Sequence, residues 1–66
     1  MTTRTFPIIV QVDDARIDTR LRALSNEKPV VVALRLRDRG WDPYKVSFDP
    51  KTGEWIAQAF ERRQAS

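Results

Sequence analysis

Residues 44–60 read YKVSFDPKTGEWIAQAF, two alternating runs joined by a turn. Pro50 presets the backbone for a turn and Gly53 can adopt the left-handed conformation, so a loop from Pro50 to Gly53, closed by Asp49 and Glu54, is expected. This loop fixes the register of the two strands. On one face it pairs Phe48 with Trp55, Val46 with Ala57 and Tyr44 with Ala59, and on the other it leaves Lys45, Ser47, Ile56, Gln58 and Phe60.

The preceding segment, 29–37, reads PVVVALRLR and has two interpretations. At the period of a strand, Val30, Val32, Leu34 and Leu36 share one face, whereas at the period of a helix the apolar side chains scatter. We therefore predict a strand. The alternative is a helix over 29–39 that ends at Gly40, with Arg35 and Arg37 on its surface.

The first third of the chain predicts one strand and one helix. Phe6–Val12 is β-branched and apolar, and Pro7 places it at the start of a strand or on a sheet edge. Asp13 and Asp14 can cap a helix over residues 14–24, whose apolar residues recur at three and four positions: Ile17, Leu21 and Leu24. The predicted fold class is α+β: a small βαβββ domain with a four-stranded mixed sheet and one helix on one face.

Length and composition indicate a single domain that needs outside support. The chain has 66 residues without Cys or His, so neither a disulfide nor a structural zinc site can stabilise its fold. A chain of this length removes only about 60% of its unfolded surface from water, so oligomerisation or docking is expected. We predict one domain over 1–66, with polar tails at 1–5 and 61–66. Met1 is followed by polar residues without an apolar segment, so a cytoplasmic location is expected.

One helix shelters only one face of the predicted sheet, and the other face combines apolar and basic side chains. Such a face is expected to contact a partner, because the uncovered face of a solitary sheet is normally polar. Trp41 lies in a predicted loop and is either an exposed hot spot or a lid on the core. The predicted partner-binding residues are Ile9, Val31, Arg35, Arg37, Lys45, Ile56, Gln58 and Phe60, with Trp41 as the candidate hot spot.

These patterns predict a non-enzymatic binding module, acting as a homodimer or as a small accessory or regulatory subunit of a larger protein complex. The alternative is a small basic nucleic-acid-binding protein that uses the same face, since 12 Lys and Arg against 9 Asp and Glu give a net charge of +3. The carboxylates fall at predicted caps and turns, so no catalytic residue, metal site or cofactor is predicted. We expect neither a small-molecule substrate nor a membrane partner.

Overall fold

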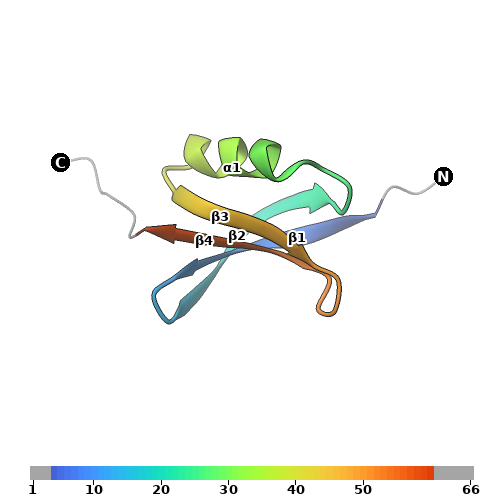
Figure 1. The fold of residues 1–66 in the computed structure, drawn as a ribbon, viewed down its shortest axis with the longest axis horizontal. Helices are drawn as coiled ribbons and strands as arrows, with labels where there is room; N and C mark the ends of the chain where they lie inside the picture. The colour runs from blue at the N-terminus through green and yellow to red at the C-terminus, as the bar shows by residue number, and fades with distance from the viewer. Residues whose placement is uncertain (1–3, 61–66) are drawn as a thin grey trace.

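The computed structural model describes residues 4–60, which form a four-stranded sheet with one helix on one side (Figure 1). The elements are β1 (Thr5–Val12), β2 (Ala15–Leu24), α1 (Pro29–Asp38), β3 (Asp42–Asp49) and β4 (Glu54–Phe60). The strand order is β2-β1-β4-β3; β1 and β4 are parallel, and the outer pairs are antiparallel. The predicted fold class, a small α+β domain with a mixed four-stranded sheet and one helix, is confirmed.

The prediction of a helix over 14–24 is wrong, because this segment is strand β2. Asp13, with φ of 53°, belongs to the tight turn between β1 and β2 instead of capping a helix. Residues 19–21 of β2 lie opposite the single residue Ile8, since Asp18 pairs with Ile9 and Arg22 with Pro7. Because this bulge interrupts the alternation of a strand, the apolar residues of β2 recur at the spacing of a helix.

The prediction of a strand over 29–37 is also wrong, and the helical alternative is confirmed: α1 occupies Pro29–Asp38. Pro29 presets the first helical turn, and Gly40, with φ of 91°, follows the last one. Val32 and Leu36, one turn apart, are both fully buried. The element order is therefore ββαββ. The segment is helical because burial of Val32 and Leu36 outweighs the poor helix propensity of valine.

The hairpin of β3 and β4 follows the predicted register over most of its length. Asp49 pairs with Glu54, Phe48 with Trp55 and Val46 with Ala57. The amide of Gly53, with φ of 69°, donates to the Asp49 carbonyl over 2.9 Å. The predicted pairing of Tyr44 with Ala59 is wrong, because Pro43 takes that place.

The core lies between α1 and one face of the sheet. The strands contribute Ile8, Val10, Ala23, Trp55, Ala57 and Ala59, and the helix contributes Val32 and Leu36. Phe48 lies between Phe6 and Trp55, with ring centroids 5.1 and 5.5 Å away. The buried indole of Trp55 donates from Nε1 to the Leu24 carbonyl over 3.0 Å, so its one polar group is satisfied.

Residues 1–3 and 61–66, which make up most of the predicted tails, lie outside the described residues, and Thr5 already belongs to β1. Among residues 4–60, no helix has both the length and the apolar character needed to cross a bilayer.

Gly53→Ala should destabilise the domain through the backbone alone. The added Cβ would meet the Phe6 ring at 3.5 Å, an ordinary contact, whereas φ of 69° is strained for alanine. We expect a loss of about 1 to 2 kcal/mol in the free energy of unfolding, measured by urea denaturation. Thr52→Ala, at an exposed position of the same loop, is the control and should change stability by less than about 0.5 kcal/mol. Equal losses in the two variants would contradict this assignment.

Leu34 and Leu36 separate the helix from the strand assignment. On a strand the two side chains would share a face, whereas on α1 Leu36 is buried and Leu34 is 57% exposed. Leu36→Ala should therefore cost about 2 to 4 kcal/mol of stability. Leu34→Ala should cost less than about 0.5 kcal/mol. Similar costs for the two variants, measured by the same denaturation, would refute the placement of α1.

Candidate functional site: the uncovered face of the sheet

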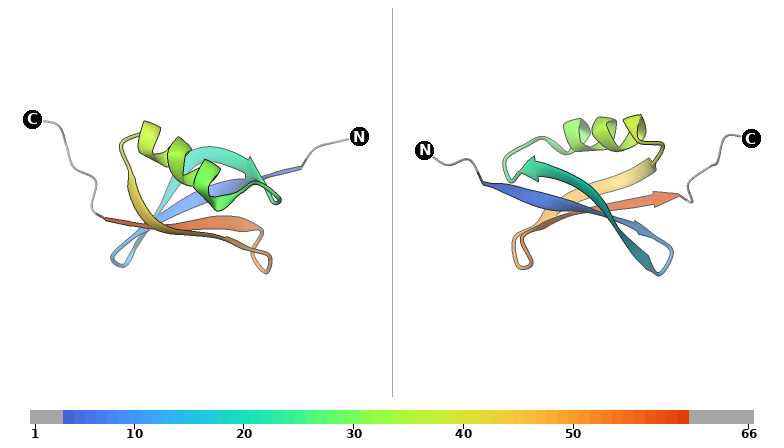
Figure 2. Two further views of the ribbon diagram at one scale, coloured as in Figure 1. Left: turned by 45° about the horizontal axis from the view of Figure 1, so that its top comes forward. Right: turned by 180° about the vertical axis from the view of Figure 1, so that it is seen from behind.

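Among residues 4–60, the sheet face opposite α1 carries no second layer (Figure 2). Its side chains come from alternate positions of the strands, and the parallel ladder sets Ile9 beside Ile56 and Gln11 beside Gln58. The last residue of β4, Phe60, continues this face beyond Gln58. We call this surface the uncovered face.

An aromatic pair, Tyr44 and Phe60, stands at one end of the uncovered face. The two rings are tilted by 41° with centroids 4.7 Å apart, and the residues are 59% and 61% exposed. A bulge produces this pair: Pro43 is opposite Ala59 and Lys45 is opposite Gln58, so Tyr44 is an extra residue between them. Tyr44 is therefore not paired with Ala59 in the ladder, and its side chain is not confined to the core side of the sheet.

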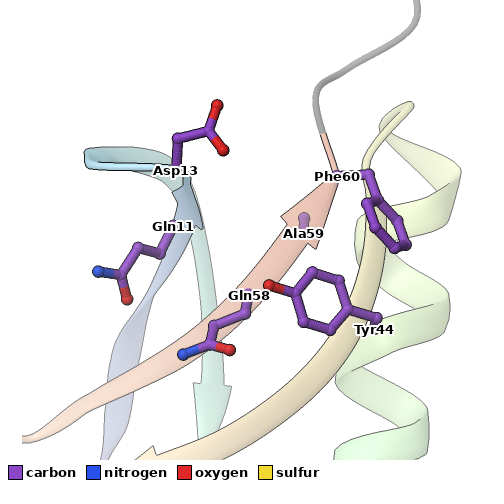
Figure 3. Close-up of a pocket in the computed structure, with 6 residues that line it drawn as sticks. All are labelled: Gln11, Asp13, Tyr44, Gln58, Ala59 and Phe60. Carbon is purple, nitrogen blue, oxygen red and sulfur yellow. The ribbon is translucent and has the colours of Figure 1, made fainter.

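A shallow pocket of about 440 Å³ adjoins the aromatic pair (Figure 3). The Tyr44 and Phe60 rings lie on one side of it, and the amide side chains of Gln11 and Gln58 extend from neighbouring strands. Each amide can both donate and accept hydrogen bonds. Asp13, from the turn after β1, adds the one carboxylate among the lining residues. The pocket therefore offers aromatic surface and neutral polar groups, with a negative charge at its rim.

Ile9 is less accessible than an uncovered face would suggest, with only 8% of its surface exposed. Its neighbours across the sheet are Asp18 on β2 and Ile56 on β4. On the same face, Arg16 of β2 reaches Glu54 of β4 in an ion pair of 2.9 Å, and β1 lies between these two strands. The arginine therefore spans the strand that carries Ile9, and the accessible apolar surface is concentrated at Ile56 and the aromatic pair.

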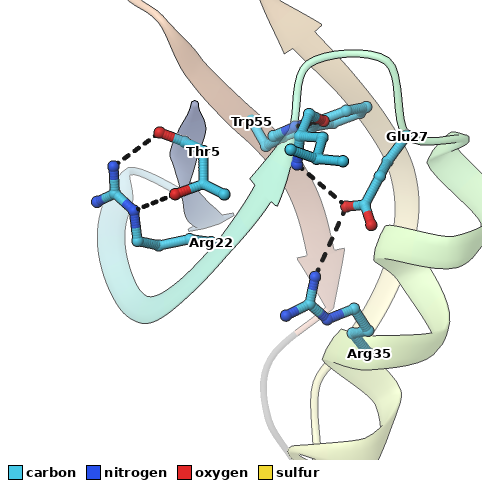
Figure 4. Close-up of polar contacts among 6 residues, drawn as sticks. Thr5, Arg22, Glu27, Arg35 and Trp55 are labelled. Atoms are coloured by element: carbon cyan, nitrogen blue, oxygen red, sulfur yellow. Dashed lines mark hydrogen bonds and ion pairs between the residues drawn. The ribbon is translucent and has the colours of Figure 1, made fainter. Parts of the chain in front are cut away.

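The structure divides the predicted partner-binding residues between two surfaces. Val31, Arg35 and Arg37 lie on α1, away from the uncovered face, because their segment is helical. Arg35 forms an ion pair of 3.6 Å with Glu27, which also accepts a hydrogen bond from the Leu24 amide (Figure 4). The prediction that all of these residues share one face of the sheet is therefore wrong. The residues that do share the uncovered face are Ile9, Lys45, Ile56, Gln58 and Phe60.

Trp41, the candidate hot spot, lies partly buried against the core cluster. This position corresponds to the lid interpretation of its indole. Sequence reasoning missed Tyr44, because the predicted register pairs it with Ala59 on the face opposite Phe60. Pro43 carried the missing signal, because proline within a strand is confined to edge strands, strand starts and bulges.

The opposite end of the sheet has a second hollow, of about 410 Å³, with basic and aromatic lining. The Arg4 guanidinium lies 5.1 Å from the centroid of the Phe6 ring, and Lys51 lines the same hollow. Nearby, Arg22 ties the end of β2 to β1 through bonds of 2.9 and 2.8 Å to the hydroxyl and carbonyl of Thr5 (Figure 4). Within residues 4–60, no group of three His, Cys, Asp or Glu is placed to hold a metal ion.

Comparison with known proteins gives no relative. No protein-family model matches the chain, and neither the curated proteins nor the solved structures contain a match.

Proposed function

We propose that this chain is a non-enzymatic binding module whose uncovered face is covered by protein, either a second copy of itself or a larger complex of which it is a small accessory or regulatory subunit. The observation that carries the proposal is the Tyr44–Phe60 pair, two adjacent rings that are 59% and 61% exposed. Large aromatic side chains clustered at the surface are typical anchors of protein interfaces.

The surroundings of the aromatic pair support a protein partner. Gln58 and Lys45 stand opposite each other beside the aromatic pair, and Ile56 adds aliphatic surface further along the same face of β4. A mixture of aromatic, aliphatic and polar side chains with few charges is typical of protein interfaces. A contact of roughly 800 Å² on each partner would also add the stability that a small domain lacks.

Nucleic acid is the second candidate, and one observation favours it. Tyr44 gives the uncovered face a second aromatic ring, and the Gln11 and Gln58 amides beside it can bond to base edges. The distribution of charge on the uncovered face gives little support to a nucleic-acid partner. Of the three basic residues predicted for this face, Lys45 is there and Arg35 and Arg37 are on α1, while Asp13 lines the pocket. We therefore place the protein partner first.

The proposal includes neither catalysis nor a cofactor. Two aspartates bind the backbone: Asp18 accepts from the Arg20 amide over 2.9 Å and Asp49 from the Lys51 amide over 3.0 Å. Each bond stabilises an irregular segment of the chain, namely the bulge of β2 and the turn before β4.

Phe60→Arg tests the proposal, because a charged side chain at an exposed aromatic anchor should abolish association while leaving the fold intact. Sedimentation equilibrium should show that the wild-type chain either forms a homodimer or binds its larger partner. The Phe60→Arg variant should show neither association. Its free energy of unfolding as a monomer should stay within about 0.5 kcal/mol of wild type. Thr52→Arg adds the same charge at an exposed turn and should associate normally.

Two results would contradict the proposal. One is unfolding of the Phe60→Arg chain, which would show that the ring is needed inside the fold. The other is a wild-type chain that stays monomeric and binds single-stranded nucleic acid in a salt-sensitive way. If Phe60→Arg abolished that binding, nucleic acid would be established as the partner.

A further inference from the structure

The second hollow, of about 410 Å³, lies where three segments of the chain meet: the start of β1, the loop after β2 and the turn between β3 and β4. These segments are at the same end of the domain (Figure 1). The rings of Phe6 and Phe48, which pack against the core cluster, form its apolar part, and Ser25 adds a hydroxyl group. The hollow is therefore on the helix side of the sheet, away from the uncovered face. We call it the basic hollow.

Two cations line the basic hollow, Arg4 from the segment before β1 and Lys51 from the turn before β4. Neither takes part in the two ion pairs recorded within residues 4–60. The Arg4 guanidinium lies over the Phe6 ring, 5.1 Å from its centroid, which holds the charge beside the apolar part of the hollow while its N–H groups can still donate. Two segments that are far apart in the sequence therefore bring two positive charges to one recess.

Acidic side chains do not cancel these charges, because none is found among the described residues that line the hollow. The acidic residues close to the lining residues in sequence are Glu27, Asp49 and Glu54. Glu27 and Glu54 form ion pairs of 3.6 and 2.9 Å with arginines that do not line the hollow. Asp49 follows Phe48 in β3, so its carboxylate points to the other face of the sheet, where it accepts from the Lys51 amide over 3.0 Å. The hollow therefore keeps a positive charge.

The charge and the donors of the basic hollow match a phosphate monoester. Such a group carries a charge of about −1.5 to −2 at pH 7 and has three strong acceptor oxygens. The two cations match this charge, and the Arg4 guanidinium, the Lys51 ammonium and the Ser25 hydroxyl are all able to donate to its oxygens. A carboxylate and a backbone phosphate of nucleic acid each carry a single negative charge. Charge complementarity therefore favours the monoester over both.

We propose that the basic hollow binds a phosphorylated side chain of a partner protein. The hollow is open to solvent, so it can hold the phosphate while the rest of the ligand stays outside, as when a larger molecule presents a side chain. Clusters of cations with an arginine are a recurrent way to recognise such groups. The Phe6 and Phe48 rings would contact the carbon atoms that carry the phosphate. Because this site is separate from the uncovered face, the proposal does not rest on the function proposed for that face.

Titration with three synthetic peptides, followed by nuclear magnetic resonance, tests this proposal. The peptides consist of alanine and glycine around one central residue, which is phosphoserine, glutamate or serine. The phosphoserine peptide should shift the signals of Phe6, Ser25 and Gly53, the glutamate peptide should bind about tenfold more weakly, and the serine peptide should not bind. Between pH 7 and pH 5 the affinity for the phosphoserine peptide should fall by up to about tenfold, because its phosphate takes up a proton with a pKa of about 6 and loses one negative charge.

Arg4→Ala and Lys51→Ala should each weaken binding of the phosphoserine peptide about tenfold or more. Arg39→Ala removes the same charge at the far end of α1 and should bind like wild type, as should Phe60→Arg on the uncovered face. Equal binding of the three peptides, no binding of the phosphoserine peptide, or equal losses in Lys51→Ala and Arg39→Ala would overturn the proposal. So would inorganic phosphate that binds as tightly as the peptide, or a chain that ignores the peptides and binds phosphatidic acid vesicles, because the ligand would then be a free anion or a lipid.

Discussion

The parallel pairing of β1 with β4 is the constraint on which the rest of the structure depends. It runs from Ile8 opposite Trp55 to Gln11 opposite Gln58 and joins two hairpins into one sheet. Parallel strands cannot be connected by a tight turn, so the chain between the hairpins must cross over the sheet, and α1 lies in that crossover. Trp55 secures one end of the ladder, because its buried indole also bonds to the end of β2 through the Leu24 carbonyl.

Two exposed apolar surfaces follow from this arrangement. A single crossover places a single helix, so one face of the sheet is sheltered and the other is not. The helix in turn has only one side against the sheet, where Val32 and Leu36 are buried, and its outer side carries Val30 and Leu34 in the open. A chain this short has no further element among its described residues to cover either surface. Its apolar residues exceed what its own layers can shelter.

The C-terminal hairpin was predictable because local chemistry specifies it: Pro50 and Gly53 set the turn, and the turn sets the pairing of Phe48 with Trp55. In the two misassigned segments the spacing of the apolar residues was misleading, although Pro29 and Gly40 do mark the ends of α1. In β2 the bulge at residues 19–21 gave the apolar residues a helical spacing, and in α1 alternating valines and leucines imitated a strand although alternate members are exposed. In the candidate site, Ile56, Gln58, Lys45 and Phe60 were placed correctly by the hairpin register. Tyr44 was not, because the one-residue bulge after Pro43 moves its side chain out of the alternating register that the turn alone predicts.

The bulges also affect the two edges of the sheet. An open sheet exposes two outermost strands, and regular outermost strands recruit further strands without limit. Here both of them are irregular: β2 has three residues opposite one and a left-handed backbone at Arg20, and β3 has an extra residue at Tyr44 next to a proline that lacks an amide hydrogen. Growth of a fibre through backbone hydrogen bonds is thereby obstructed on either side. Apolar side chains can therefore be exposed on the faces of this domain without a regular strand at either edge of its sheet.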